Sequence, residues 1–126
     1  MDNHKIRLLL IEDDSLIVKI YTTRLKADGY TVVSAENGEA GLAMAQQEKP
    51  DLILLDVMMP ILDGYSVLER LRTLPDFKTI PILVYSNLAQ DGEIEKGKQL
   101  GATEFIVKAN ISPTELVNKI KSYIQK

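Results

Sequence analysis

Polar residues that can take part in ionic chemistry follow four of the short apolar runs in the sequence. In chain order they are Glu12, Asp13 and Asp14, then Asp56, then Ser86, and finally Lys108. If these runs are parallel strands of one sheet, the residues after them meet at the same edge, where open α/β sheets form their binding sites. We therefore expect two or three carboxylates, a hydroxyl and an ammonium to gather there.

The chemistry expected of this group is phosphoryl transfer. Neighbouring carboxylates raise the cost of ionising one another. A divalent cation relieves that cost, and oxygen ligands suit Mg²⁺, which usually keeps several waters. Asp56 ends an apolar strand, so we expect an exposed carboxylate with a buried stem, a weak nucleophile toward phosphorus. Mg²⁺ and Lys108 would neutralise the oxygens of an incoming phosphoryl group, and Ser86 would hydrogen-bond one of them.

The elements that must position these residues alternate along the chain. Continuous apolar runs predict strands that are covered on both faces, at Ile6–Ile11, Thr31–Ala35, Leu52–Leu55, Ile80–Tyr85 and Phe105–Val107. Apolar residues at helical spacing predict helices between and after them, at Ser15–Asp28, Gly38–Glu48, Gly64–Thr73, Asp91–Leu100 and Ser112–Lys126. This order predicts an α/β fold in which helices cover both faces of a five-stranded parallel sheet.

Three helix ends carry recognisable signals. Asp14 is expected to cap the first helix, and Gly29 stands where its C-terminal cap would be. The last helix begins with Ser112 as cap, Pro113 at the first helical position and Glu115 three residues after the cap. The helix at Asp91–Leu100 has few apolar positions and is the weakest of the five.

Length and composition favour a single cytoplasmic domain spanning residues 1–126. The chain has 126 residues and no cysteine, so a disulfide or a thiolate metal site is excluded. Its net charge of -3 provides no general attraction to nucleic acids or to an anionic membrane surface. We expect no signal peptide, no membrane span, no direct nucleic-acid binding and no output domain within these residues.

Five motifs, in this order and at this spacing, carry a resemblance that covers essentially the whole chain. The sequence resembles the receiver domain of bacterial two-component response regulators, of the stand-alone, single-domain type. The matching residues are Leu10-Ile11-Glu12-Asp13-Asp14, Leu55-Asp56-Val57-Met58-Met59-Pro60 with Asp63-Gly64, Val84-Tyr85-Ser86, Gly101-Ala102, and Phe105-Ile106-Val107-Lys108.

The resemblance implies a flavodoxin-like, doubly wound (βα)5 three-layer sandwich with strand order 2-1-3-4-5. It implies that Asp56 accepts a phosphoryl group from a phosphohistidine on a sensor histidine kinase or a histidine phosphotransfer protein. It implies Mg²⁺ bound by the Asp13 and Asp56 side chains and the Met58 carbonyl, with Glu12 acting through water. Ser86 and Phe105 would shift together and change the affinity of the fourth helix, fifth strand and fifth helix for a downstream target.

Departures from the family pattern lead to further expectations. Lys108 is followed by Ala109 where the family has proline in a cis bond, and a cis bond without proline costs ~2.5–4 kcal/mol, so we predict a trans bond and an altered loop. The switching aromatic, Phe105, lacks the hydroxyl of the more familiar tyrosine. Met58 and Leu88 are apolar where such domains admit the hydrolytic water, which predicts a long-lived phospho-Asp56.

The same sequence also bears on oligomerisation and on other functions. No arginine follows Arg72, so we do not expect the acid–arginine dimer network of DNA-binding relatives. The chain reads as a switch with Mg²⁺-dependent self-phosphorylation and slow self-dephosphorylation, and not as a turnover enzyme. The alternatives are a phosphorelay intermediate, a non-phosphorylated receiver-like binding module, an aspartyl-phosphate phosphatase, which Val57-Met58 after Asp56 disfavours, and an FMN-binding domain, which the acidic first loop disfavours.

Overall fold

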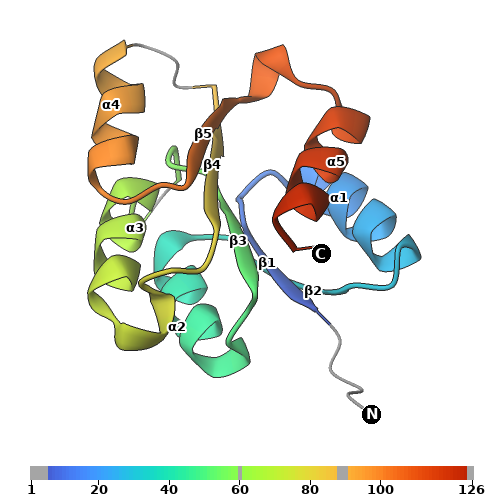
Figure 1. Ribbon diagram of the computed structural model, residues 1–126, viewed down its shortest axis with the longest axis horizontal. Helices are drawn as coiled ribbons and strands as arrows, with labels where there is room; N and C mark the ends of the chain where they lie inside the picture. Colours follow the sequence, from blue (N-terminus) through green and yellow to red (C-terminus); the bar gives the residue numbers. More distant parts are fainter. Residues whose placement is uncertain (1–5, 60, 88–90, 125–126) are drawn as a thin grey trace.

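Strands and helices alternate through the whole of the computed structural model, which describes residues 6–59, 61–87 and 91–124 (Figure 1). The strands are β1 (Arg7–Ile11), β2 (Thr31–Ala35), β3 (Leu52–Leu55), β4 (Ile82–Ser86) and β5 (Glu104–Val107). The helices are α1 (Ser15–Ala27), α2 (Gly38–Glu48), α3 (Gly64–Thr73), α4 (Asp91–Gln99) and α5 (Pro113–Ile124), with 3-10 turns at Pro75–Phe77 and Lys108–Asn110. The predicted elements are confirmed, with ends that differ by one or two residues.

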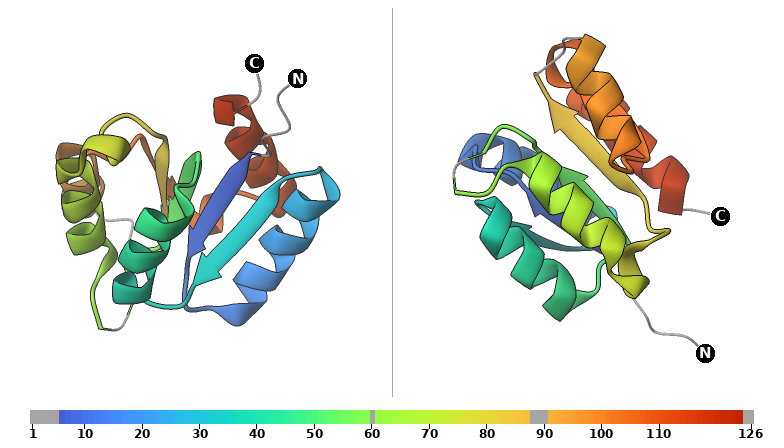
Figure 2. Two further views of the ribbon diagram at one scale, coloured as in Figure 1. Left: turned by 90° about the horizontal axis from the view of Figure 1, so that it is seen from below. Right: turned by 90° about the vertical axis from the view of Figure 1, so that its left-hand side faces the viewer.

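All five strands are parallel and stand in the order β2-β1-β3-β4-β5. Helices α1 and α5 cover one face of the sheet, and α2, α3 and α4 cover the other (Figures 1 and 2). The strand order reverses between β1 and β3, which is where doubly wound folds bind their ligands. The predicted flavodoxin-like, three-layer α/β architecture is therefore confirmed.

Each face of the sheet has its own apolar core. The core under α1 and α5 contains Leu8, Leu10, Leu52, Leu54, Leu83 and Ile106, and the core under α2, α3 and α4 contains Leu9, Ile11, Ile53, Leu55, Ile82 and Val84. Alternate residues of a strand point to opposite faces. A strand buried on both faces must therefore be apolar at every position, and this is why the sequence runs are continuous and not alternating.

The predicted helix ends are also confirmed. The Asp14 side chain accepts hydrogen bonds from the backbone N–H groups of Leu16 and Ile17, at 3.0 and 3.3 Å. At α5, Ser112 Oγ accepts from the Glu115 N–H at 3.1 Å, and Glu115 Oε1 accepts from the Ser112 N–H at 2.9 Å. These reciprocal bonds satisfy donors that the first turn of a helix otherwise leaves unpaired. The cap of α1 also fixes the loop that carries the first acidic group.

A guanidinium ties together the edge of the sheet that lies opposite the acidic loops. Arg72, near the end of α3, donates from Nε to the carbonyl of Gly101 at 2.9 Å and from Nη1 to those of Phe77 and Ile80 at 2.7 and 2.8 Å. Its Nη2 donates to Thr103 Oγ1 at 3.2 Å. These acceptors precede β4 and β5, so Arg72 holds the amino ends of both strands.

Among the described residues, no helix combines the length and apolar character needed to cross a membrane.

Candidate functional site

The strand register places two carboxylates side by side at the carboxyl edge of the sheet. Ile11 of β1 pairs with Leu55 of β3, so the next residues, Glu12 and Asp56, leave the sheet as neighbours. The Asp56 N–H donates to the Ile11 carbonyl at 2.9 Å, which continues the parallel ladder by one more bond. Both side chains are buried, with 5% of Glu12 and 4% of Asp56 exposed.

Lys108 reaches from the outer strand to both of these carboxylates. Its predecessor, Val107, is in register with Ser86 of β4, so Lys108 emerges at the same edge. Its Nζ donates to Glu12 Oε1 at 2.8 Å and to Asp56 Oδ2 at 3.2 Å. The predicted gathering of carboxylates, hydroxyl and ammonium at one edge is therefore present, and the ammonium already bridges two of the acids.

Burial and crowding make this cluster attractive to positive charge. Burial raises the pKa of Glu12 from 4.5 to about 7, helped by the charge of Asp56 and opposed by the hydrogen bond from Lys108. Burial alone would lower the pKa of Lys108, but its hydrogen bond to Glu12 and the charges of the two carboxylates outweigh burial and raise that pKa above 10.5. The site thus stabilises the charged form of Lys108 and the protonated form of Glu12.

The residues present fit a hard divalent cation. Glu12, Asp13 and Asp56 each offer a carboxylate oxygen, and these oxygens lie within 4.8 Å of one another. Three carboxylates against the single ammonium of Lys108 leave an excess of negative charge when all are ionised. Asp13 is exposed, so a hydrated ion has access from solvent. Carboxylate oxygens with room for water are the ligand set that Mg²⁺ prefers.

The expectation of an exposed Asp56 carboxylate was wrong. The carboxylate is buried, and each of its oxygens accepts a hydrogen bond: Oδ2 from Lys108 Nζ, and Oδ1 from the Met58 N–H at 2.9 Å. The loop after β3 also returns closely over the strand end, since a Cβ added at Gly64 would overlap the Asp56 carbonyl. The Met58 side chain itself is 55% exposed, and Leu88, the other expected barrier to water, lies outside the described residues.

The two residues expected to switch lie on β4 and β5. Ser86 ends β4 and is fully buried. Phe105 is half-buried and packs against α4, where a Cβ added at Gly97 would lie 2.9 Å from Phe105 Cδ2. Tyr65 of α3 borders the same contact and donates from its hydroxyl to the Glu93 carbonyl of α4 at 3.0 Å. The Phe105 ring therefore lies at the junction of α3, α4 and β5.

The peptide bond after Lys108 has the predicted geometry. No peptide bond between the described residues is cis, so the bond to Ala109 is trans as predicted. Lys108–Asn110 forms one 3-10 turn, and the Ala109 N–H donates to Asn87 Oδ1 at 3.0 Å. A proline at position 109 could not make this bond, because it has no N–H. This hydrogen bond links the segments that follow β4 and β5.

Sequence reasoning missed an aromatic pair next to the cluster. Lys108 Nζ lies 5.3 Å from the centroid of the Tyr85 ring, and the Tyr85 hydroxyl is 3.1 Å from that of Tyr21. A spacing signal existed for the position of Tyr85, because Leu83 and Tyr85 alternate onto one face of β4. No sequence signal announces the pairing of the two hydroxyls.

Comparison with known proteins agrees with this geometry. Residues 8–121 match the response regulator receiver domain family. The chain is 39% identical over 126 residues to the "Probable transcriptional regulator ycf27" of Porphyra purpurea, covering all of this chain and 50% of that protein. It is 38% identical over 122 residues to the alkaline phosphatase synthesis transcriptional regulatory protein PhoP of Bacillus subtilis, covering 95% of this chain and 49% of that protein.

A solved structure extends the agreement to three dimensions. The chemotaxis protein CheY4 of Vibrio cholerae superposes with a TM-score of 0.87 at 28% identity, covering 95% of this chain and 99% of that one. The fold and the acidic site define a small α/β signalling domain. The chain belongs to the response regulator receiver domain family, which acts in two-component signalling. It spans about half the length of the curated relatives that it matches.

Proposed function

We propose that this chain is a phosphorylation switch in which Asp56 accepts a phosphoryl group from a phosphohistidine. The donor would be a sensor histidine kinase or a histidine phosphotransfer protein. The observation that carries the proposal is the placement of Asp56 between two hydrogen-bond donors and beside two further carboxylates, Glu12 and Asp13. A carboxylate held in this way can form a bond to phosphorus without a general base.

The proposed step exchanges a P–N bond for a P–O bond. A carboxylate oxygen of Asp56 bonds to phosphorus while the P–N bond of the donor breaks, and the imidazole leaves with that electron pair and takes up a proton. When bound, Mg²⁺ supplies positive charge beside the transferring oxygens. The carboxylates of Asp13 and Asp56 would hold it, with the Met58 carbonyl as a further ligand and Glu12 acting through water.

Lys108 and Ser86 would serve the phosphoryl group after transfer. The Lys108 ammonium lies 3.2 Å from Asp56 Oδ2, so a small displacement moves it from the carboxylate to a phosphoryl oxygen. Ser86 ends the neighbouring strand, and its hydroxyl would donate to a second oxygen. Inward movement of this hydroxyl would leave space for Phe105, and so change the surface of α4, β5 and α5 that a downstream target binds.

Phospho-Asp56 is expected to be long-lived, so the chain would act as a switch and not as a turnover enzyme. Hydrolysis needs a water that a polar neighbour orients, and Met58 offers only an apolar side chain beside Asp56. Met58→Asn supplies an amide at this position and should shorten the lifetime severalfold. Unstimulated decay of the wild-type phosphoprotein within seconds would contradict this part of the proposal.

Phosphoramidate is a suitable first donor because its P–N bond stands in for that of phosphohistidine. The intact mass of the protein is followed with and without Mg²⁺, beside Asp56→Asn and the matched control Asp76→Asn, whose carboxylate is well exposed and far from the site in sequence. We expect a Mg²⁺-dependent gain of one phosphoryl group in the wild type and in Asp76→Asn, and none in Asp56→Asn. Equal labelling of all three proteins would rule out Asp56 as the acceptor.

A further inference from the structure

An aromatic ring lies beneath the ammonium of Lys108, and the transfer described above does not use it. Tyr85, the penultimate residue of β4, is 6% exposed, and Lys108 Nζ stands over its ring at 5.3 Å from the centroid. The face of an aromatic ring attracts an ammonium within about 6 Å. Lys108 therefore has two carboxylates as partners on one side and a ring face on another.

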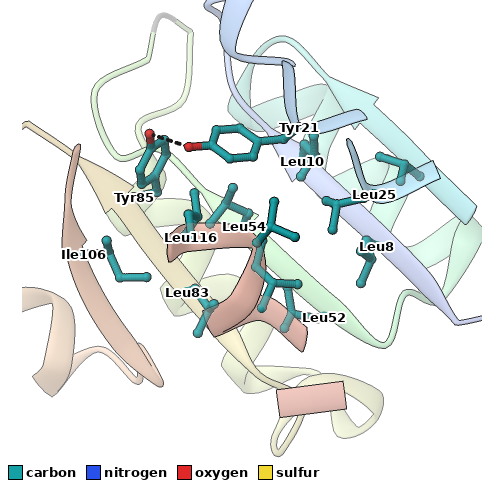
Figure 3. Close-up of a cluster of buried hydrophobic side chains, with 13 residues drawn as sticks. Leu8, Leu10, Tyr21, Leu25, Leu52, Leu54, Leu83, Tyr85, Ile106 and Leu116 are labelled. Atoms are coloured by element: carbon teal, nitrogen blue, oxygen red, sulfur yellow. Dashed lines mark hydrogen bonds between the residues drawn. The ribbon is translucent and has the colours of Figure 1, made fainter. Parts of the chain in front are cut away.

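A second tyrosine fixes the orientation of this ring. Tyr21 of α1, which is 2% exposed, meets Tyr85 edge-on, with ring centroids 5.8 Å apart and planes at 86°. The two hydroxyls are 3.1 Å apart, and Figure 3 shows this bond at one end of the core. Burial and the hydrogen bond to Tyr85 raise the pKa of Tyr21 well above its ordinary value, so the Tyr21 hydroxyl keeps its proton.

The position of this pair argues for more than core packing. The residues below Tyr85 in the same core are mostly aliphatic, among them Leu83, Leu54 and Leu116. A buried tyrosine hydroxyl needs a hydrogen-bond partner. An aliphatic residue at position 85 would fill the core without that requirement. The chain instead places two phenols at the end of the core that borders Lys108. The ring supplies what an aliphatic side chain cannot, which is attraction for a cation.

That attraction matters because Lys108 must change partners during the proposed transfer. Before transfer the ammonium is bonded to Glu12 and Asp56, and afterwards it must reach a phosphoryl oxygen. A ring face attracts the ammonium in both states and offers no oxygen that competes with the phosphoryl group. Such an attraction would favour positions of the Lys108 ammonium above the ring.

We propose that Tyr85 is a positioning residue that keeps the Lys108 ammonium over the reaction site, and that the edge-on contact of the Tyr21 ring holds the Tyr85 ring in the required orientation. This inference rests on the proposed phosphoryl transfer to Asp56, and its role lies in the rate of that step. Tyr85 would act on the transfer only through Lys108.

Three variants separate the ring from the hydroxyl and from simple packing. Tyr85→Phe keeps the ring, Tyr85→Leu removes it, and Tyr85→Met fills more of its volume with an unbranched side chain should the leucine variant fail to fold. With phosphoramidate and saturating Mg²⁺, we expect the phosphorylation rate of Tyr85→Phe to stay within about twofold of wild type, and that of Tyr85→Leu or Tyr85→Met to fall by about three- to tenfold. Equal rates for Tyr85→Phe and the ring-free variants would overturn the proposal.

A second measurement does not depend on phosphorylation. In NMR spectra of the unmodified protein, the ε-methylene protons of Lys108 should be shifted upfield by the ring current in wild type and Tyr85→Phe, and the shift should vanish in Tyr85→Leu or Tyr85→Met. If the wild type takes up no phosphoryl group, the proposed function fails, while this shift still decides whether the ring holds Lys108. An unshifted Lys108 in the wild type would refute the placement itself.

Discussion

Replacing Gly97 by alanine tests how tightly α4 is fitted to the Phe105 ring. In an exposed helix, a Gly→Ala change stabilises by about 0.5–1 kcal/mol because alanine loses less backbone entropy on folding. Gly97 is buried and faces β5, and its added Cβ would lie 2.9 Å from Cδ2 and 3.3 Å from Cε2 of Phe105. Contacts this short force the ring or the helix to move.

The contact should therefore reverse the sign of the usual effect. Overpacking a buried contact costs about 1–3 kcal/mol, and the gain in helix propensity returns about 0.5–1 kcal/mol of that. We expect Gly97→Ala to lower the free energy of unfolding by about 1–2 kcal/mol. The third neighbour, Tyr65 Cε1, is at an ordinary contact distance of 3.7 Å and should add nothing.

A double-mutant cycle in urea decides between a contact effect and a helix effect. In the Phe105→Ala background the obstructing ring is gone, so Gly97→Ala should stabilise by about 0.5–1 kcal/mol, as in an open helix. The midpoint of unfolding would be compared at constant m-value, with Gly92→Ala as control, because a Cβ at Gly92 meets nothing within 4 Å. Stabilisation by Gly97→Ala in the wild-type chain would refute the reasoning.

Three further results are expected. Arg72→Lys should cost about 2–3 kcal/mol of unfolding free energy, because a single ammonium cannot bond three carbonyls and Thr103 Oγ1 together. Burial would raise the pKa of Glu104, but hydrogen bonds from Lys119 and Tyr123 outweigh it and lower this pKa below 4.5. Ionised Glu104 should therefore stabilise the fold at pH values above 4.5, and this contribution should be lost as the pH falls through the pKa of the folded state. Mg²⁺ at ten times its Kd should stabilise the wild-type protein by about 1.4 kcal/mol. The same Mg²⁺ concentration should stabilise the Asp13→Asn variant by much less.

Each of these results has a direct check. Urea unfolding measures the cost of Arg72→Lys, and a change within 0.5 kcal/mol, about that of an ordinary surface substitution, would show that the guanidinium bonds add little. For Glu104, the stability difference between wild type and Glu104→Gln should shrink as the pH falls below 4.5, and a constant difference would contradict the assignment. For Mg²⁺, Ca²⁺-free buffers and a titration of the melting temperature give Kd, and an equal response of Asp13→Asn would remove Asp13 from the ligand set.

The sequence predicts the fold well because each element is determined locally. Strands buried on both faces, such as β1 and β3, read as continuous apolar runs, and caps such as Asp14 and Ser112 stand within three residues of what they bind. Boundaries are less certain where a neighbour decides them. The predicted strand began at Ile80, but the Ile80 carbonyl bonds to Arg72 and the ladder of β4 begins only at Ile82.

The sequence predicts where the candidate site residues lie, but not how deeply Asp56 is buried. Residue order along parallel strands places Glu12, Asp56 and Lys108 at one edge, and this needs only the topology. The burial of Asp56 depends on where the Lys108 side chain and the Met58 N–H finally point, which no spacing rule gives. The Tyr21–Tyr85 bond joins residues 64 positions apart and is equally invisible in the sequence.

The guanidinium of Arg72 anchors β4 and β5 at one end only. It fastens the chain before β4 and before β5, at residues Ile80 and Thr103, while the other ends of these strands carry Ser86 and Lys108. Because these hydrogen bonds restrain the amino ends of β4 and β5, any displacement of the two strands should be smallest near Arg72 and largest beside Asp56. Phosphorylation of Asp56 would then displace α4 and α5 at the carboxyl edge of the sheet, and the segments bonded to Arg72 would keep their positions.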